Sequence, residues 1–514
     1  MVRKNKQEAE KVTEKKERST VARKDQRSQP TESQFEESDE VPLCVDLDGT
    51  LVYSDTSWES VIRLLRRWPW MVVCFPFWLL RGRAHFKAEV ASRVAFEPEH
   101  LGYIEEILEF LKEEKAKGRS LVLATAANQS IADIVSRHLG LFDRALGSDE
   151  KINLKGLRKA ETLVDSYGRQ GFDYVGNDQA DIAVWEQARI AYVVNASEKL
   201  RRRMGAWGSH IEKLPMLNLN LFDFARALRM HHWIKNALLL VPLVAAHRFT
   251  DISEWIKLMI GIVAFGVCAS SAYLVNDLLD IESDRRHRSK RARVIASGKL
   301  RISKGIYLAL GLLVVGVLLA LGLPEGFLAC LLIYWLGANL YSLFLKQIYL
   351  VDVVVLAGLY FLRILSGAEI VDVVVSPWLF IFSLFFFLSL ALSKRYVELL
   401  RIADLPVTKI AGRGYGTGDG WVVLLSGAGS GVLSIIVLAF YMNSGHIDTL
   451  YRKAEFIWIG VLLTLVWISR VWYRAKRGLL DDDPIIFAIK DRTSYVILGL
   501  IMVCVLLSSP ILGR

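Results

Sequence analysis

The sequence contains few cysteines, and none lies in a pattern that would bind a metal or form a disulfide framework. Five occur among 514 residues, scattered along the chain: Cys44, Cys74, Cys268, Cys330 and Cys504. This spacing predicts neither a zinc site nor a redox motif. Apolar residues are scarce in residues 1–40, which are highly charged. That composition predicts a disordered tail without the apolar core of a cleavable signal peptide.

Basic residues are scarce in alternate loops of the C-terminal part. From about residue 230, nine apolar segments recur, several near the length that crosses a bilayer. They lie at about 233–247, 255–275, 304–322, 325–345, 349–366, 376–393, 421–441, 455–473 and 493–511. If the N-terminal part is cytoplasmic, so are the loops after the second, fourth, sixth and eighth segments, and these contain most of the basic residues. We therefore expect nine spans in the cell inner membrane and a cytoplasmic N-terminal domain.

The net charge of +10 follows from this asymmetry and requires no nucleic-acid partner. Three carboxylates begin where the second apolar segment ends, at Asp277, Asp280 and Asp284. Side chains at this spacing share one helical face. At a membrane edge they are costly unless neutralised, which Mg²⁺ holding a diphosphate would do, with Asn276 as a further ligand. A solvated, positive-inside loop would explain the basic run at 285–293 but not the three acids.

Residues 41–205 have the alternating strand and helix pattern of a soluble α/β domain. A short apolar strand ends in Asp46-Leu47-Asp48-Gly49-Thr50, where two carboxylates point the same way as they leave the strand. Asp46 would attack phosphorus while Asp48 handles the proton of the leaving group, with Mg²⁺ screening the phosphate. A second strand ends in the hydroxyl of Thr125.

This pattern resembles the haloacid dehalogenase superfamily, and its second aspartate favours the phosphatases. The resemblance implies a Rossmann-like fold with a helical cap at about 56–100, and Thr125 as the phosphate-holding hydroxyl. It also implies Lys159 as the conserved-motif lysine, with Lys155 as an alternative. The acidic fourth motif departs from the pattern because Asn177 stands where its first aspartate belongs. Either Asn177 binds Mg²⁺ through its amide oxygen or Asp178 replaces it beside Asp181. A third alternative is that the domain is not catalytic.

The segment at 68–80 is rich in tryptophan and proline but too short to span a bilayer. Basic residues flank it at Arg63, Arg66, Arg67, Arg81 and Arg83. Together these residue types predict an element at the membrane interface. A cap core or a subunit contact is the alternative.

The apolar segments and the Asn-Asp-x-x-Asp-x-x-x-Asp motif resemble the UbiA superfamily of intramembrane prenyltransferases, over about 220–514. The usual second aspartate pair is absent after the sixth segment, which argues against aromatic prenylation. The stretches 229–236, 287–298 and 341–346 resemble the decaprenyl-phosphate phosphoribosyltransferase branch, although several of its prolines are missing.

In that branch a polyprenyl phosphate attacks the anomeric carbon of phosphoribosyl diphosphate and expels diphosphate. The resemblance implies catalytic Asp277 and Asp280 with Mg²⁺, and Lys346 and Arg363 as a clamp for the lipid phosphate. An interface anchor is the alternative for Lys346, and Asp352 is the expected partner of Arg363. The implied substrate-binding residues are Lys235, Asn236, His287, Lys290, Arg293, Tyr341, Lys346, Arg363, Lys394 and Arg395.

The fusion implies that the α/β domain removes the 5-phosphate, giving polyprenyl-phosphoribose for cell-envelope glycans. Three alternatives stay open: an aromatic prenyltransferase, an inactive or regulatory α/β domain, and a transporter or channel. The predicted domain boundaries give a tail at 1–40, the α/β domain at 41–205, a linker or amphipathic connection at 206–229 and the membrane domain at 230–514. Homo-oligomerisation and the length of the lipid stay open.

Overall fold

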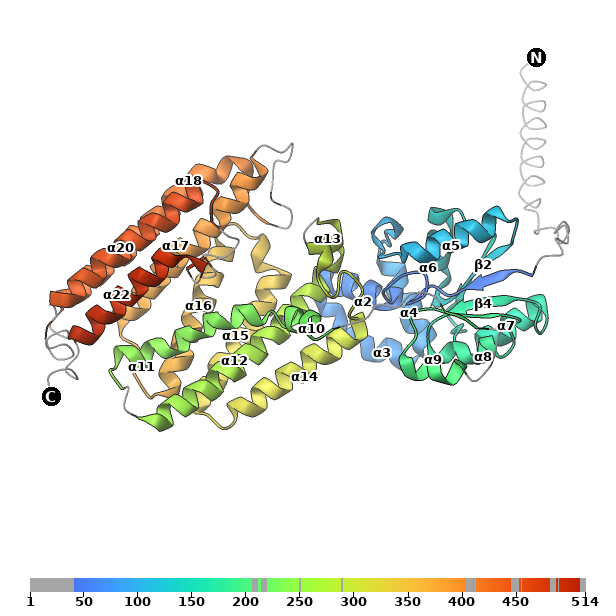
Figure 1. The fold of residues 1–514 in the computed structure, drawn as a ribbon, viewed down its shortest axis with the longest axis horizontal. Coiled ribbons are helices and arrows are strands. Elements are labelled where there is room, and N and C mark those ends of the chain that lie inside the picture. The colour runs from blue at the N-terminus through green and yellow to red at the C-terminus, as the bar shows by residue number, and fades with distance from the viewer. Residues whose placement is uncertain are drawn as a thin grey trace, which may run out of the picture. The chain divides into compact units, whose positions relative to one another are not determined.

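The computed structural model describes residues 41–205, 211–213, 220–248, 251–287, 290–403, 410, 413–444, 453, 455–480, 487–488 and 490–508. The expected tail, much of the expected connection and the end of the ninth expected span lie outside these residues. Figure 1 shows the described chain as an N-terminal part with strands and a C-terminal part made of helices.

The N-terminal domain is built on six parallel strands in the order β3-β2-β1-β4-β5-β6. Their bounds are β1 Leu43–Val45, β2 Leu121–Asn128, β3 Arg144–Ser148, β4 Asp173–Gly176, β5 Ala191–Val193 and β6 Ile211–Lys213. Because β2, β1 and β4 are parallel neighbours, the segments that follow them meet at one edge of the sheet. The expected boundary at 205 is wrong, because β6 belongs to the sheet. A three-residue edge strand carries too little periodicity to be recognised in the sequence.

Each face of the sheet is covered by helices, and alternate side chains of the central strand β1 pack against the two sets of helices. Leu43 and Val45 pack on one side with helices α5 and α6, whereas Cys44 packs on the other with α7, α8 and α9. Figure 1 shows these two sets on opposite sides of the strands. This alternation follows from the period of two along a strand. The helices are α5 Glu105–Ala116, α6 Gln129–Leu139, α7 Leu157–Tyr167, α8 Ile182–Trp185 and α9 Glu198–Gly205.

An all-helical insertion separates β1 from α5. It comprises α2 Thr56–Arg67, the 3₁₀ helix η1 Pro69–Cys74, α3 Phe75–Leu80, α4 Arg83–Arg93 and the 3₁₀ turn η2 Pro98–His100. Asp55 caps α2 by accepting hydrogen bonds from the backbone N–H groups of Ser57 and Trp58. Trp70 and Phe77 expose two thirds of their surface, so η1 and α3 present an unburied apolar face.

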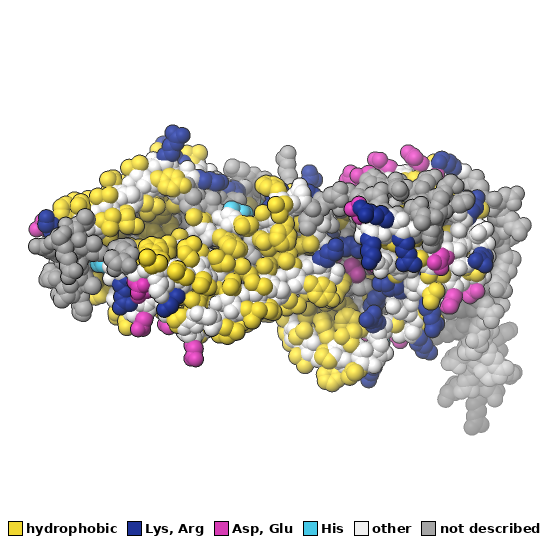
Figure 2. Space-filling view, turned by 60° about the horizontal axis from the view of Figure 1, so that its bottom comes forward, with side chains coloured by type: hydrophobic (Ala, Val, Ile, Leu, Met, Phe, Trp, Pro, Cys, Tyr) yellow, Lys and Arg dark blue, Asp and Glu magenta, His cyan; other side chains and the backbone are white. Residues whose placement is uncertain are grey.

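Among the residues that the structure describes, the C-terminal domain contains seven helices long and apolar enough to cross a membrane. They are α12 Ile252–Leu279, α14 Ile302–Ala320, α15 Glu325–Leu343, α16 Val351–Ile370, α17 Pro377–Ile402, α18 Gly420–Met442 and α20 Glu455–Lys476. Figure 2 shows hydrophobic side chains over much of this domain's visible surface. The other short elements are α10 Leu221–Ala227, η4 Met230–Leu240, α11 Val241–Ala245, α13 Ile281–Arg286, η5 Lys290–Ala292, η6 Leu345–Gln347, η7 Thr417–Asp419 and α22 Arg492–Ser508.

Two of the nine expected spans take other forms among the described residues. The first consists of η4 and the short α11, which has Pro242 in its first turn. The last is α22, which has 17 residues. The total of nine therefore stays a prediction.

Close packing of α17, α18 and α20 depends on a glycine. Gly427 of α18 leaves room for the Trp472 indole, which a Cβ at this position would overlap. The indole N–H of Trp472 donates to the Ser389 hydroxyl at 2.9 Å, and that hydroxyl donates to the Gly427 carbonyl at 2.7 Å. Three helices therefore meet through one indole and one hydroxyl.

We predict that Gly427→Ala lowers the free energy of unfolding by about 1–3 kcal/mol, the usual cost of overpacking a core. Gly429→Ala on the same helix is the matched control, because a Cβ there meets nothing within 4 Å. Thermal unfolding in detergent measures both. Equal midpoints for the two variants would show that Trp472 does not fix the approach of these helices.

The insertion packs against the C-terminal domain through α2. Ile62 is buried in a cluster with Leu274 and Leu278 of α12 and Ile302 of α14. Arg285 of α13 pairs with the buried Glu59 of α2 at 2.8 Å. Apolar burial and an ion pair thus hold the two domains together.

A glycine allows the same two domains to approach closely. Gly298 adopts a φ of +77°, and a Cβ there would overlap the side chain of Tyr53. Only glycine combines this backbone conformation with such a close contact.

Candidate active sites

The first candidate site lies at the edge of the sheet where β1, β2 and β4 end. Asp46 is buried, and its Oδ1 accepts a hydrogen bond from Lys159 Nζ at 2.7 Å. Lys159 also donates to the Tyr174 hydroxyl at 2.8 Å, which in turn donates to Asp181 Oδ1 at 2.9 Å. A lysine thus links the carboxylates that follow β1 and β4. Lys155, the alternative lysine, is exposed.

The charges of this site are set by burial and by that lysine. Burial raises the pKa of Asp46 to about 6, although Lys159 opposes the rise. Burial also raises the pKa of Asp48, and Asp55 and Asp46 add to the effect. A raised pKa favours a protonated Asp48, which suits a proton donor. Burial alone would lower the pKa of Lys159, but Asp46 and Asp181 raise it, so the lysine is charged.

The residues of the fourth motif separate into buried and exposed positions. Asn177 is buried, and its amide lies against Gly49, directly after Asp48. Asp181 Oδ2 accepts hydrogen bonds from the backbone N–H groups of Asn177 and Asp178, both at 3.0 Å. Asp178 is exposed, and its carboxylate caps the 3₁₀ turn η3 Gln179–Asp181. This geometry favours Asn177 over Asp178 as the residue beside the first motif, with its amide nitrogen closer to Gly49 than its amide oxygen.

Oxygen donors gather here in the kind of set that Mg²⁺ prefers: carboxylates, an amide and a hydroxyl. The residues that would hold the ion are Asp46, Asp48 and Asn177, while Thr125 is buried within the neighbouring strand β2, which continues beyond it to Asn128. A bound Mg²⁺ would screen the charge of an incoming phosphate.

Lys87 of α4 was not predicted from the sequence. Its Nζ donates to the carbonyl of Ala126, the residue directly after Thr125, at 2.6 Å. It also donates to Asn153 Oδ1 at 3.2 Å. Burial lowers its pKa, although Asp48 and Asp55 oppose this. The insertion therefore places a cation at the edge of the sheet where β1, β2 and β4 end. A lysine within an amphipathic helix gives no local signal for such a role.

The second candidate site lies where α12 ends. The expected helix is interrupted at Asp280, since α12 ends at Leu279 and α13 begins at Ile281. Two backbone hydrogen bonds, from Asp280 N to Asn276 O at 2.9 Å and from Asp284 N to Asp280 O at 2.8 Å, preserve the helical spacing through the break.

Each of the three aspartates has a basic partner. Arg293 Nη1 donates to Asp277 at 3.1 Å and to Asp284 at 2.6 Å, so these two carboxylates share one nitrogen atom. Asp277 also pairs with Arg229. Lys346 Nζ lies 2.9 Å from both oxygens of Asp280. Carboxylates that converge on shared cations fit a divalent ion, and one bound here would neutralise a diphosphate leaving group.

Burial raises the pKa of Asp284 to about 6, although Arg293 opposes the rise. Burial lowers the pKa of Lys346, and Asp280 opposes that shift. The expected lipid-phosphate clamp therefore already has a partner, and that partner is an aspartate of the acidic motif. This places Lys346 at the acidic cluster.

Arg229 belongs to the stretch 229–236, which resembles the phosphoribosyltransferase branch, but the sequence predicted no role for it. Its backbone adopts a left-handed φ of 49°, which non-glycine residues rarely do. Its guanidinium lies over the Tyr273 ring at 5.1 Å and pairs with Asp277. Such a conformation costs on the order of 1 kcal/mol and marks a functional candidate.

A separate buried cation lies deeper in the bundle. Arg363 of α16 is 3% exposed and donates to the Tyr334 hydroxyl at 2.9 Å, the Asn236 amide oxygen at 3.3 Å and the Leu359 carbonyl at 2.8 Å. Within the described residues, no carboxylate lies within ion-pair distance of its guanidinium. The expectation that Asp352 is its partner is wrong. An apolar bundle with a buried cation of this kind suits an anionic ligand.

Asp352 instead pairs with Arg395 of α17 at 2.7 Å, and both side chains are fully buried. Arg395 also pairs with Glu398 and donates to the Tyr341 hydroxyl at 3.1 Å. The two arginines differ in their partners. Arg395 pairs with two carboxylates, whereas Arg363 pairs with none among the described residues. Sequence alone could not assign Asp352, because both arginines follow it on apolar helices.

Four further expected residues differ in how deeply they are buried. His287 and Lys290 are exposed after α13, and Lys394 is half-buried beside Arg395. Lys235 is buried, and its Nζ lies 5.6 Å from the centre of the Tyr360 ring, which Arg363 also faces at 5.6 Å. Lys235 and Arg363 thus share one aromatic neighbour.

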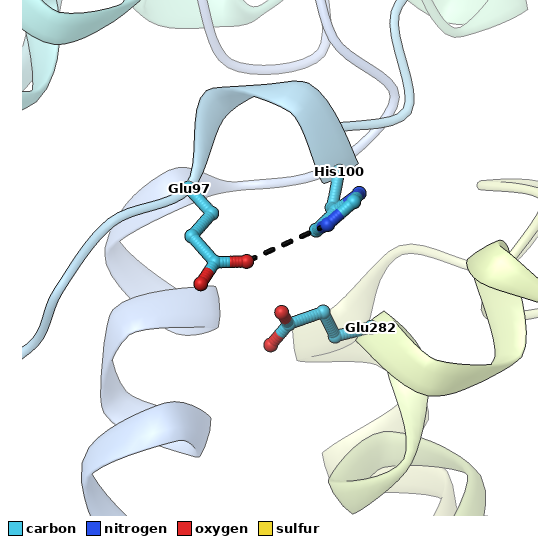
Figure 3. A group of neighbouring side chains, drawn as sticks. All are labelled: Glu97, His100 and Glu282. Atoms are coloured by element: carbon cyan, nitrogen blue, oxygen red, sulfur yellow. Dashed lines mark ion pairs between the residues drawn. The ribbon is translucent and has the colours of Figure 1, made fainter. Parts of the chain in front are cut away.

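Side chains of metal-binding type also gather where η2 meets α13. Ligand atoms of Glu97, His100 and Glu282 lie within 4.8 Å of one another (Figure 3). Arg286 pairs with Glu97 at 2.7 Å and with Glu282, and Arg63 lies 3.6 Å from Glu282. Since basic side chains already neutralise these acids, the group is an ion-pair cluster that joins the two domains.

Comparison with known proteins identifies both domains. The profile of the UbiA prenyltransferase family matches residues 237–490, and that of the haloacid dehalogenase-like hydrolases matches residues 43–165. The uncharacterised protein y4nM of Sinorhizobium fredii is 37% identical over 464 residues, 90% of each chain. The chain belongs to the UbiA prenyltransferase family. It carries an N-terminal haloacid dehalogenase-like (HAD-like) domain.

Other relatives of the UbiA protein match shorter stretches. Nodulation protein NoeC of Azorhizobium caulinodans is 33% identical over 281 residues, 54% of this chain and 90% of NoeC. The decaprenyl-phosphate phosphoribosyltransferase of Corynebacterium glutamicum is 33% identical over 186 residues, 35% of this chain and 56% of its own length. A solved UbiA homologue from Archaeoglobus fulgidus, bound to GPP and Mg²⁺, aligns with 55% of this chain and 98% of its own at 15% identity and a TM-score of 0.44.

We predict that Asp277→Asn weakens the binding of Mn²⁺ with pyrophosphate at least tenfold, because one carboxylate of the cluster loses its charge. Electron paramagnetic resonance of Mn²⁺ in the purified protein measures this. Glu325→Gln, at an exposed position on α15, is the control. Unchanged Mn²⁺ binding by Asp277→Asn would rule out a metal at the aspartate cluster.

We predict stability effects of different size for substitutions of the two buried arginines. Arg395→Met leaves Asp352 and Glu398 without their shared cation and should cost about 3–5 kcal/mol. Arg363→Met leaves no carboxylate unpaired, so it should cost far less while abolishing the binding of a phosphate ligand. Thermal unfolding and titration with polyprenyl phosphate in detergent measure the two effects. Equal destabilisation, or intact lipid binding by Arg363→Met, would contradict the assignment of Arg363 to a ligand.

Proposed function

We propose that this protein transfers a 5-phosphoribosyl group from phosphoribosyl diphosphate to a polyprenyl phosphate in the membrane. The observation that carries the proposal is the distribution of buried and half-buried cations in the UbiA domain. Lys346, Arg229 and Arg293 surround the aspartate cluster, and Arg363 lies apart without a carboxylate. Two separate cationic regions suit a donor and an acceptor that both carry phosphate.

The position after α17 supports this choice of substrates. An aromatic prenyltransferase of the family carries a second acidic motif there, whereas this chain has Lys394 and Arg395. Arg395 is fully buried and bound to Asp352, so the position is part of a fixed ion-pair network. The partial match to decaprenyl-phosphate phosphoribosyltransferases points the same way.

In the proposed transfer, a phosphate oxygen of the lipid attacks the anomeric carbon. The bond from that carbon to the diphosphate breaks, and the diphosphate leaves with the bonding electrons through an oxocarbenium-like transition state. Arg229, Arg293 and Lys346 lie where they would stabilise the charge that develops on the leaving group. Mg²⁺ at Asp277, Asp280 and Asp284 would supply further electrostatic stabilisation.

The HAD-like domain would then remove the 5-phosphate. Asp46 attacks phosphorus and the bond from phosphorus to the sugar oxygen breaks, while Asp48 gives its proton to that oxygen. Water hydrolyses the resulting aspartyl-phosphate. Lys159 holds Asp46 in place at 2.7 Å. The product would be a polyprenyl-phosphoribose, a lipid-linked pentose donor suited to cell-envelope glycan synthesis.

We further propose that the HAD-like domain faces the cytoplasm at the inner membrane and that η1 and α3 lie at the bilayer surface. Trp70, Phe77 and Leu80 are exposed there by 66%, 66% and 85%. Arg67 and Arg81, also exposed, flank this apolar face, as expected for an element that rests among lipid headgroups. An interfacial phosphatase would reach a substrate anchored in the lipid.

The test is to incubate the purified protein with Mg²⁺, polyprenyl phosphate and phosphoribosyl diphosphate and to weigh the lipid products. We predict polyprenyl-phosphoribose from the wild type. Asp46→Asn keeps the shape of the side chain but removes the nucleophile, so its product should be heavier by one phosphate.

Identical lipid products from wild type and Asp46→Asn would show that the HAD-like domain does not act on this lipid. A parallel incubation with a prenyl diphosphate and hydroxybenzoate tests the rival activity. Prenylated aromatic at a comparable rate would overturn the phosphoribosyl assignment, and full transfer in excess chelator would overturn the role of Mg²⁺.

A further inference from the structure

We propose that helix α2 of the HAD-like domain completes the donor site of the UbiA domain, and that Arg66 binds the donor's diphosphate. The identity of the donor rests on the function proposed above. The inference about Arg66 concerns a diphosphate at the aspartate cluster, which can be tested with inorganic pyrophosphate.

Helix α2 is held against the UbiA domain independently of Arg66. Ile62, one turn earlier on the same helix, is 7% exposed and buried among residues of α12 and α14. Glu59, a further turn earlier, is 1% exposed and pairs with Arg285. Residues 59, 62 and 66 share one helical face, so the contacts of the first two direct the third toward the end of α12.

Arg66 reaches the acidic motif itself. Its Nη1 donates to the carbonyl of Leu279, the last residue of α12, at 3.2 Å. Its Nη2 lies 3.9 Å from Asp280 Oδ1, within ion-pair range but beyond a hydrogen bond. Among the described residues this bond to Leu279 is the one hydrogen bond of the guanidinium. The remaining N–H groups are therefore available to an anion.

The charge around Asp280 exceeds what Asp280 needs. Lys346 already bonds to both of its oxygens at 2.9 Å. Arg66 Nη2 lies 3.9 Å from the same carboxylate, so two cations share it. Two cations beside one carboxylate leave an excess of positive charge, which further negative charge would balance. A diphosphate would supply that charge, and a guanidinium binds phosphate oxygens in a fixed fork.

The anchor to Leu279 offers a rival explanation, in which Arg66 merely joins the two domains. Two substitutions separate the roles. Arg66→Gln retains an amide that can donate to the Leu279 carbonyl but has no charge. Arg66→Lys retains the charge. Arg67→Ala is the matched control, because Arg67 is the next residue, is exposed and lies over Trp68 rather than toward α12.

The full-length protein is titrated with Mg²⁺-pyrophosphate by calorimetry, and KM for phosphoribosyl diphosphate is measured alongside kcat. We expect Arg66→Ala and Arg66→Gln to weaken pyrophosphate binding and to raise this KM by about tenfold or more, the effect of losing one charge-assisted hydrogen bond. Arg66→Lys should recover part of the affinity. KM for polyprenyl phosphate and the binding by Arg67→Ala should not change.

Wild-type affinity for pyrophosphate in Arg66→Gln would overturn the inference, as would equal losses in Arg66→Ala and Arg67→Ala. A wild type that binds Mg²⁺-pyrophosphate without transferring phosphoribose would refute the proposed function, and the Arg66 variants would still decide this inference by binding alone. A wild type that binds no pyrophosphate would refute both.

Discussion

Three carboxylates lie where the chain leaves the apolar part of α12, and the structure around them provides the charge that balances them. Their partners come from widely separated segments: Arg229 before η4, Arg293 after η5, Lys346 in η6 and Arg66 in the HAD-like domain. Isolated charges at the edge of a low-dielectric region would be costly. The position of four segments is thus tied to one patch of negative charge.

The two buried arginines show that the same residue type serves different ends in this bundle. Arg395 is compensated by Asp352 and Glu398, which makes it part of the structural framework. Arg363 is surrounded by aromatic rings and neutral acceptors, at 4.6 Å from the Tyr334 ring centre and 5.3 Å from that of Phe265. Rings can stabilise a cation but cannot cancel its charge. The difference between the two environments is therefore electrostatic.

Much of the α/β domain could be predicted because its signals are local. A short apolar strand followed by Asp46 and Asp48 needs no knowledge of distant residues, and parallel strands bring their ends together. Lys159 could be proposed from its place in a motif, and it lies 2.7 Å from Asp46. The aspartate cluster was equally visible, because its spacing places the side chains on one face.

The remaining features depend on contacts between distant segments. Lys346 was expected at a lipid phosphate but pairs with Asp280, 66 residues earlier. Asp352 was assigned to Arg363 on its own helix α16 but pairs with Arg395 of the neighbouring helix α17, and periodicity along one helix does not reveal such a partner. The basic residues of α2 indicated a membrane surface, yet Arg63 and Arg66 contact α13 and α12. Local sequence carries no record of the partner across a domain boundary.

The contact between α2 and the UbiA domain has a consequence for how the protein is made. Arg285 is synthesised 226 residues after its partner Glu59, and the apolar neighbours of Ile62 on α12 and α14, among them Leu274 and Ile302, are likewise synthesised long after α2. At about 5–20 residues per second, α2 leaves the ribosome many seconds before these helices exist. During that interval its apolar face and the Glu59 carboxylate have no docking surface. Folding of the N-terminal domain is therefore finished only after the first membrane helices have been inserted.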